Sequence, residues 1–298
     1  MVWRPTLPTK DSSQRLDVRK TYKLYVGGAF PRSESGRSYV VSDAKGKFLA
    51  NASQASRKDG RDAVVAARKA FGGWSARTAY NRGQVLYRIA EVMEGRHEQF
   101  SSEVASSEGL SISKARAVVD ASIDRWVWYA GWADKLAQVV GSSNPVAGPY
   151  FDFSLPEATG VVAVLAPQDS SLLGLTSVIA PAIVSGNTVV AVTSFERPLP
   201  AVTLGEVMAT SDVPGGVVNI LTGSASEIGP WLASHSDVNA IDLAGISDHE
   251  EATALEAASA ENLKRVRRPA EEDWTESPGL SRLTQYLELK TVWHPIGL

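Results

Sequence analysis

The stretch GVVAVLAPQDSSLLGLTSVIAPAIVSGNTVVAV, residues 160–192, decides the fold of this chain. Its two ends, Val161 to Ala166 and Thr188 to Val192, are short apolar runs, each typical of a strand buried on both faces. Ser171 to Ser185, between them, is long enough for a helix that crosses from one strand to the next. A strand, a crossover helix and a second buried strand predict a parallel sheet covered by helices on both faces.

The same alternation continues toward the C-terminus. Two further apolar strands are expected at Val217 to Leu221 and at Ala240 to Leu243. Helices are expected at three places: Ala201 to Ser211, Ser226 to Ser234, and Asp248 to Leu263. With right-handed crossovers, this order predicts an α/β fold with a doubly wound parallel sheet.

Residues 267–281 separate this pattern from one more strand. They are charged and contain Pro and Gly, so we expect a linker, and the basic and acidic residues at 264–273 are expected to be solvated and to compensate one another. Leu287 to Trp293 then alternates apolar and polar residues as a strand does. A strand beyond a linker needs a partner edge for its backbone hydrogen bonds.

The N-terminal part is expected to form a helical layer with small strands. The expected elements are a flexible lead at residues 1–20, a hairpin at Tyr22 to Phe30 and a strand at Arg37 to Val41. Helices are expected at Arg61 to Phe71, ended by Gly72 and Gly73, at Asn81 to Ser106 and at Ser113 to Val139.

A last strand is expected at Phe151 to Leu155, after a turn-rich linker at Gly141 to Pro149. Its apolar residues alternate with Asp152 and Ser154, which predicts a strand whose apolar face is buried.

Composition excludes several classes of protein. The 298 residues contain no cysteine, so disulfides, thiolate metal sites and a cysteine nucleophile are excluded. The net charge is −3 without a basic stripe, which argues against nucleic acid as a partner. The most apolar stretch, Ser177 to Val192, is interrupted by Pro181 and Gly186, so no membrane span is expected. Residues 1–20 lack a signal-peptide pattern, and we expect a cytoplasmic protein.

Two polar features have ordinary explanations. Ser170 and Ser171, beside Asp169, could suggest a hydrolase, but these residue types more often form a helix N-cap. The histidines lack the spacing of metal ligands, so no metal site is expected at His97, His235, His249 or His294.

Several runs, in order, resemble the aldehyde dehydrogenase superfamily. The matching runs are Leu24-Tyr25-Val26-Gly27-Gly28, Ala63 to Arg68, Tyr129 to Lys135, Ala180-Pro181-Ala182, Ser185 to Val190, Pro214 to Asn219, Ala257 to Val266, and Tyr286 to Trp293. Pro214-Gly215-Gly216-Val217-Val218-Asn219 is the most specific of them. The resemblance covers nearly all of the chain beyond residue 20.

The resemblance implies a domain organisation. It implies a Rossmann-like cofactor domain from residues 21–148 and 159–266, and a small β oligomerisation arm from residues 149–158 and 282–298. In the family a catalytic domain, with the nucleophilic cysteine, lies between the last two matching runs. Here only the linker 267–281 stands there, which is too short for a domain.

The resemblance also implies that the catalytic positions are changed. Where the family has an Asn whose amide stabilises an oxyanion, this chain has Asp169, which accepts hydrogen bonds and would repel the anion. Pro269 stands where the family has its general-base Glu. Together with the missing thiol, these changes imply that no catalytic residue remains.

The cofactor positions are changed as well. Val192 and Phe195 stand where the family holds the adenosine ribose with polar side chains. The run Leu243 to Ile246 is followed by Asp248, Glu250 and Glu251, whose carboxylates would oppose a diphosphate at the helix N-terminus. No cofactor is therefore predicted. If the vestigial cleft still binds NAD or NADP, the candidate residues are Pro167, Asp169, Gly223 and Gly245.

The resulting hypothesis is a non-catalytic member of the family, a pseudoenzyme. It would act as a structural or regulatory subunit, as a homo-oligomer or as a hetero-oligomer with a full-length aldehyde dehydrogenase. The alternatives are a residual NAD(P)-binding aldehyde oxidoreductase, a nucleotide sensor, and a remnant with no present role.

Overall fold

The parallel sheet predicted from residues 160–192 is the centre of the molecule. The computed structural model describes residues 19–297. Five parallel strands lie in the order β7-β6-β5-β8-β9. They are β5 (Val161–Leu165), β6 (Thr188–Val192), β7 (Val218–Leu221), β8 (Ala240–Asp242) and β9 (Arg265–Arg267). This confirms the doubly wound α/β fold, with one edge strand, β9, that the sequence pattern did not indicate.

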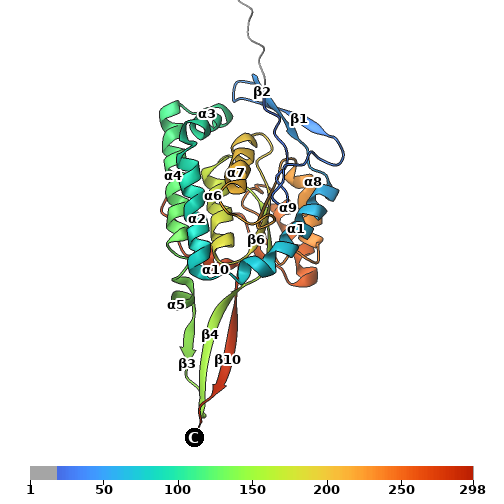
Figure 1. Ribbon diagram of the computed structural model, residues 1–298. Helices are drawn as coiled ribbons and strands as arrows, with labels where there is room; N and C mark the ends of the chain where they lie inside the picture. The colour runs from blue at the N-terminus through green and yellow to red at the C-terminus, as the bar shows by residue number, and fades with distance from the viewer. Residues whose placement is uncertain (1–18, 298) are drawn as a thin grey trace, which may run out of the picture.

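Helices cover both faces of this sheet (Figure 1). The helices that follow its strands are α6 (Leu173–Val184), α7 (Leu199–Ala209), α8 (Ala225–Ser234) and α9 (His249–Ser259), the last extended by a 3-10 turn at Ala260–Asn262. Alternate strand residues point into two separate cores: Val162 and Val164 pack with α6 and α7, while Val161 and Ala163 pack with α8 and α9. Because successive side chains of β5 point to opposite faces of the sheet, the helices that pack on them lie in two layers.

The N-terminal half completes these layers. Its helices are α1 (Arg57–Ser75), α2 (Ala79–Glu94), α3 (His97–Glu108), α4 (Ile112–Ala130) and α5 (Leu136–Val140). A separate antiparallel pair is formed by β1 (Ser38–Ser42) and β2 (Phe48–Ser53). Of the expected hairpin at 22–30, the structure has the tight turn, in which Val26 and Ala29 exchange two backbone hydrogen bonds of 2.9 and 3.0 Å. The expected lead at residues 1–20 lies almost wholly outside the described residues.

Three expected helices of the N-terminal half had wrong boundaries. Helix α1 runs through Gly72 and Gly73 to Ser75, because Trp74 is buried and its indole N–H donates to the Ile183 carbonyl at 2.9 Å. The long helix expected at 81–106 is two helices, because the chain leaves helical geometry at Arg96, where φ is −118°. The helix expected at 113–139 is likewise divided, between α4 and α5.

A three-stranded antiparallel sheet projects from one end of the molecule (Figure 1). It consists of β3 (Ser142–Asn144), β4 (Tyr150–Ala158) and β10 (Leu287–Pro295), in the order β10-β4-β3. We call this sheet the arm and the rest of the described chain the body. The terminal strand thus finds its partner edge within its own chain, in a register that places Leu287 opposite Ala158 and Pro295 opposite Tyr150.

The burial pattern of β4 is opposite to the expected one. Phe151 and Leu155 are 50% and 44% exposed, whereas Asp152 and Ser154 are buried. The buried polar side chains satisfy each other, because the Asn144 amide donates to Asp152 at 2.7 Å and to Ser154 at 3.0 Å. The apolar face of the strand lies in solvent.

The segment that links β9 to the short helix α10 (Ser281–Gln285) is residues 268–280, and we call it the connecting segment. It lies along the body, with Trp274 packed against the main hydrophobic core. Within residues 19–297 no helix combines the length and the apolar character needed to cross a membrane.

Candidate functional site

The order in which strands are added to the sheet reverses between β5 and β8. After β5 the chain crosses to β6 on one side, and later it returns to add β8 on the other. Ligands of open α/β sheets bind at such a switch point. An open cavity of about 570 Å³ lies there, lined by three loops: Gln168 and Asp169 after β5, Ala244 to His249 after β8, and Pro269 to Glu271 after β9.

The four candidate residues do not all meet at this cavity. Asp169 and Gly245 line it. Pro167 is buried next to it, where its ring packs on Gly174. Gly223 lies after β7, two strands away from β5, against the backbone of Ala55. The structure therefore brings together two of the four and separates the other two.

Gly245 is required by packing. Its N–H donates to the Leu165 carbonyl at 2.8 Å, and a Cβ at this position would lie 1.9 Å from the Ala166 oxygen. The backbone of the β8 loop therefore lies directly against the end of β5, and the Gly245 amide is not available to a ligand.

Gln168, which sequence reasoning missed, closes one side of the cavity. Its amide donates to the Ala166 carbonyl at 2.7 Å, and its side-chain oxygen accepts from the Phe195 N–H at 3.0 Å. The Ser194 hydroxyl also donates to the Gln168 carbonyl, at 2.9 Å. These bonds hold the β5 and β6 loops together, so the open part of the cavity lies toward β8 and β9.

The serines beside Asp169 act mainly as structural groups. The Ser170 hydroxyl accepts from the Gly174 N–H at 2.9 Å, in the first turn of α6, but the N-cap residue is Leu172, so the expected Ser or Asp N-cap was wrong. Ser171 instead donates both its N–H and its hydroxyl to Glu108, at 2.7 and 2.6 Å. Neither serine contacts a histidine.

The residues at the expected ribose and diphosphate positions fit a dinucleotide poorly. The N-terminus of α9 is capped by its own chain, since Asp248 accepts from the Glu251 N–H at 2.8 Å. Val192 is fully buried, and the Phe195 ring stacks on Tyr39 with centroids 4.5 Å apart. Neither side chain can bond ribose hydroxyls, and the Asp248 carboxylate occupies the field that would attract a diphosphate.

An ion cluster lies at the end of β8, outside the lining of the cavity. Arg282 donates to Asp242, which is fully buried, and to both oxygens of Glu272 at 2.7 and 3.2 Å. Arg267 also donates to Glu272, at 3.2 Å, and the Tyr286 hydroxyl donates to Asp242 at 2.7 Å. The charged run at 264–273 is thus not simply solvated, because its Glu272 pairs with the buried Arg282 as well as with Arg267.

The cluster shifts the pKa values of its members. Burial alone lowers the pKa of Arg282, but the carboxylates of Asp242 and Glu272 raise it above its ordinary value. Burial opposes ionisation of Glu272, yet its bonds to Arg282 and Arg267 hold its pKa below the ordinary value. Burial, reinforced by Asp242, raises the pKa of Tyr286 well above its ordinary value. The two shifts of Arg282 and Glu272 both favour the charged forms of this ion pair.

Arg125 fixes the connecting segment from the opposite side. This guanidinium donates to the carbonyls of Trp274 and Glu276, each at 2.8 Å, and to the Ser177 hydroxyl at 2.6 Å. The Arg282 guanidinium lies over the Trp274 ring, 5.2 Å from its centroid. Two buried arginines therefore hold residues 274–276 against the body.

Comparison with known proteins places the chain in a family. Residues 30–268 match the sequence profile described as aldehyde dehydrogenase family. The chain belongs to the aldehyde dehydrogenase family.

Curated members of the family are similar over most of this chain. Retinal dehydrogenase 2 of Gallus gallus is 34% identical over 256 residues, which are 84% of this chain and 48% of that protein. Cytosolic 10-formyltetrahydrofolate dehydrogenase of Mus musculus is 32% identical over 261 residues, which are 85% of this chain and 28% of that protein. The chain thus spans half or less of the length of these relatives.

Solved aldehyde dehydrogenases share its fold. A putative aldehyde dehydrogenase from Burkholderia cenocepacia superposes with a TM-score of 0.78 at 31% identity, over 82% of this chain and 50% of that one. The NAD+ complex of an aldehyde dehydrogenase from Bacillus cereus superposes with a TM-score of 0.77 at 24% identity, over 83% and 50%.

In this aldehyde dehydrogenase family chain, Asp169 and Pro269 both line the cavity. Asp169 lies on its β5 side with an exposed side chain, and its carbonyl accepts from Arg197 at 2.6 Å. Pro269 lines the opposite side. Asp169 accepts hydrogen bonds when ionised, and Pro269 has neither a titratable group nor an N–H. Among residues 19–297, no three His, Asp or Glu side chains gather to hold a metal ion.

Proposed function

We propose that this chain is a non-catalytic member of the aldehyde dehydrogenase family that works as a structural or regulatory subunit. Its partner would be a full-length aldehyde dehydrogenase, or a second copy of the chain. Support for the loss of catalysis comes from the missing thiol and from Asp169 and Pro269 at the catalytic positions.

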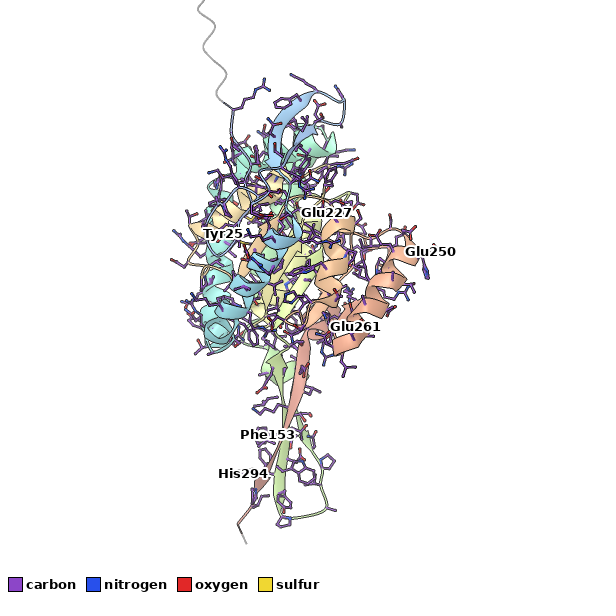
Figure 2. All side chains as sticks on the ribbon, turned by 90° about the vertical axis from the view of Figure 1, so that its right-hand side faces the viewer. Tyr25, Phe153, Glu227, Glu250, Glu261 and His294 are labelled. Atoms are coloured by element: carbon purple, nitrogen blue, oxygen red, sulfur yellow. The ribbon has the colours of Figure 1, made fainter. Side chains whose placement is uncertain are left out.

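The observation that carries the proposal is the exposure of apolar side chains on the arm. On one face of β4 lie Phe151, Phe153 and Leu155, with the ring centroids of Phe151 and Phe153 5.4 Å apart. Figure 2 shows Phe153 on the projecting arm. On the other face Trp293 is 58% exposed and meets Tyr150 edge-on at 5.6 Å. A projecting sheet with apolar side chains on both faces is the kind of surface that another chain covers.

Light scattering after size exclusion tests this proposal. The chain is co-expressed with a full-length aldehyde dehydrogenase, and each is also purified alone. We expect a complex with the full-length protein, or a mass above 31.8 kDa for the chain alone. The double variant Phe151→Ser, Leu155→Ser should weaken this association about tenfold or more, since it removes two exposed apolar anchors.

Val65→Ser is the matched control, because Val65 is 56% exposed on α1, away from the arm. It should leave the association unchanged. The proposal would be contradicted if the chain had the mass of a single chain both alone and in the mixture. It would also be contradicted if the arm variant and the control variant changed the association equally.

The open cavity at the carboxyl edge supports a second candidate, a nucleotide sensor or residual NAD(P)-binding oxidoreductase. Its volume, about 570 Å³, is sufficient for part of a dinucleotide. We expect the Asp248 cap and the apolar residues Val192 and Phe195 to make binding of NAD and NADP weak or absent. Titration calorimetry decides between the two functions, because micromolar binding of either cofactor would favour the sensor.

A further inference from the structure

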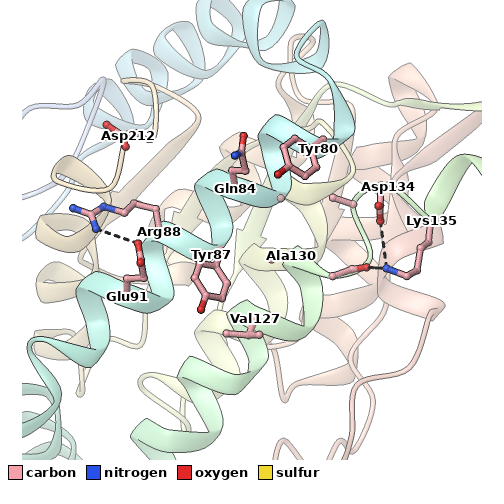
Figure 3. Close-up of a pocket in the computed structure, with 13 residues that line it drawn as sticks. Tyr80, Gln84, Tyr87, Arg88, Glu91, Val127, Ala130, Asp134, Lys135 and Asp212 are labelled. Atoms are coloured by element: carbon pink, nitrogen blue, oxygen red, sulfur yellow. Dashed lines mark hydrogen bonds and ion pairs between the residues drawn. The ribbon is translucent and has the colours of Figure 1, made fainter.

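The groove between α2 and α4 does not specify what would bind in it. It measures about 600 Å³ and lies outside the site described above (Figure 3). Each end carries charges of both signs, with Lys135 beside Asp134 at one end and Arg88 beside Glu91 at the other. Because the signs are mixed at both ends, the groove selects neither an occupant nor an orientation. The outer edge of the arm is more specific.

This outer edge belongs to β10, a strand of nine residues. β10 lies at the end of the three-stranded sheet, so within residues 19–297 its second edge has no neighbouring strand (Figure 1). A strand at a free edge presents unpaired N–H and C=O groups, and soluble proteins usually shorten, twist or cover such an edge. An edge of this length is therefore a template to which a further strand can add by main-chain hydrogen bonds.

The ladder with β4 determines which backbone groups face outward. At one end of the ladder the Thr159 N–H donates to the Tyr286 carbonyl at 3.2 Å, and at the other the Ile296 N–H donates to the Pro149 carbonyl at 2.8 Å. The backbone groups of an antiparallel strand alternate between its two edges, so the even-numbered residues of β10 face β4. The outward-facing residues are the odd-numbered ones, Leu287, Leu289, Thr291, Trp293 and Pro295.

A second copy of β10 fits this edge around a two-fold axis. In an antiparallel pair the outward-facing residues of the two strands lie opposite each other, which requires the axis to pass through a residue and not between two residues. With the axis at Thr291, the pairing extends over all nine residues of each strand. Leu289 of one copy then lies opposite Trp293 of the other, and these side chains, 60% and 58% exposed in the single chain, cover each other.

The charges on β10 favour this register over its neighbours. With the axis at Thr291, the Glu288 carboxylate lies opposite the His294 imidazole of the second copy, and Lys290 lies opposite Val292. With the axis at Lys290, the two copies of this lysine would lie directly opposite each other, where like charges are destabilising. With the axis at Val292, Lys290 would lie opposite His294, and Glu288 would have no strand residue opposite it. Strand length and charge therefore select one arrangement of two copies.

We infer that two copies of this chain pair through the free edge of β10, around a two-fold axis at Thr291, and join their arms into one continuous antiparallel sheet. Each copy contributes the same edge, the form of contact that closes with two chains. Main-chain hydrogen bonds hold the edges together, and the side-chain pairs fix the register. The contact leaves the face with Phe151, Phe153 and Leu155 open. The pairing is therefore additional to the association proposed for the apolar faces, and either can exist without the other.

Engineered cysteines test the register. The chain has no cysteine of its own, so a disulfide in a single-cysteine variant must join two copies. Thr291→Cys places the two copies of this residue opposite each other, at a Cα separation of about 5.5 Å that a disulfide can span. Under mild oxidation we expect a cross-linked species of twice the 31.8 kDa mass of one chain. Leu289→Cys is the matched control and should stay uncross-linked, because its two copies would lie four residues apart along the strands, about 13 Å.

A proline on the axis tests the backbone bonds. Thr291→Pro removes the outward N–H but no bond to β4, since proline is tolerated where the N–H of an edge strand faces solvent. Thr291→Val keeps the N–H and is the matched control, because both variants lose the hydroxyl contact with Ser154. Sedimentation velocity is run on the Phe151→Ser, Leu155→Ser background, which weakens association through the apolar faces. We expect two chains for Thr291→Val and one chain for Thr291→Pro, with circular dichroism to check that both are folded.

Three results would overturn the pairing. They are a single-chain mass for Thr291→Val at every concentration, equal masses for the two Thr291 variants, and cross-linking of Leu289→Cys as efficient as that of Thr291→Cys. The association proposed for the apolar faces would still stand if the chain with Phe151 and Leu155 intact bound a full-length aldehyde dehydrogenase. Failure of the edge contact is thus distinguished from failure of the proposed function.

Discussion

Arg282 is the residue on which the connecting segment and the sheet most depend. Its guanidinium is the cation paired with Asp242, which is fully buried. Replacing Arg282 by Met keeps much of the apolar stem but leaves Asp242 without a counter-charge. We expect Arg282→Met to lower the free energy of unfolding by about 3–5 kcal/mol, the cost of breaking a buried pair. Urea unfolding followed by tryptophan fluorescence measures it.

The control for this prediction is Arg61→Met. Arg61 pairs with its neighbour Asp62 at 2.9 Å, and both side chains are more than half exposed. This change should cost no more than about 0.5 kcal/mol. If Arg282→Met and Arg61→Met lowered the free energy of unfolding by similar amounts, the buried ion cluster would stabilise the protein no more than an exposed ion pair does.

Glu272 should make the stability of the protein depend on pH. Burial opposes its ionisation, but the bonds from Arg282 and Arg267 hold its pKa below the ordinary value. The stabilising contribution is therefore present above the pKa of the unfolded chain and is lost as pH falls through the lower pKa of the folded chain. We expect Glu272→Gln to cost about 1–2 kcal/mol at pH 7. In urea unfolding, the cost of Glu272→Gln should be smaller at low pH than at pH 7. An equal cost at low pH and at pH 7 would show that the ionised Glu272 carboxylate is not its cause.

The sequence predicted single residues well only where topology determines their position. Asp169 and Gly245 follow strands that lie side by side in a parallel sheet, so both were expected at its carboxyl edge and both line the cavity. Arg282 and Asp242 are forty residues apart and belong to no periodic pattern. Their pairing depends on the path of the connecting segment, and neither periodicity nor strand order predicts that path from the sequence.

At the scale of elements, the N-terminus of α9 makes the clearest prediction. Asp248 caps the helix with a bond of 2.8 Å to the Glu251 N–H. Asp248→Ala should lower the free energy of unfolding by about 1 kcal/mol, because that N–H loses its acceptor. Asp248→Asn keeps an acceptor and should cost much less. Thermal unfolding of the two variants compares them, and an equal loss would assign the effect to charge instead of capping.

Elements with every face buried were predicted better than those at the surface. Strand β6 has the expected bounds, Thr188–Val192, because an uninterrupted apolar run is compatible with few structures. Helix α1 passed its two glycines because the tertiary contact of Trp74 outweighs their low helix propensity. In β4 the alternation predicted the strand but not its buried face, since Asn144 of β3 covers the side that carries Asp152 and Ser154.

At the scale of the whole molecule, the body and the arm differ in how they are stabilised. The body has two extensive cores on either side of the parallel sheet. The last residue of β10 that belongs to a core is Leu287. The strand residues after it pair with β4, and Glu288 also forms an exposed ion pair with Arg265 at 3.7 Å. The body is therefore expected to fold without the outer part of the arm.

Truncation after Leu287 tests this division. Removing residues 288–298 should shift the midpoint of thermal unfolding by no more than about 3 °C, because no core residue is lost. Truncation after Arg282 is the control, since it also removes the buried side chains of Leu283, Tyr286 and Leu287 and the Tyr286 bond to Asp242. It should abolish cooperative unfolding. If removal of residues 288–298 were as damaging as truncation after Arg282, the arm would be part of the folding unit. Its exposed apolar side chains would then be explained by the stability of the chain itself, without a partner.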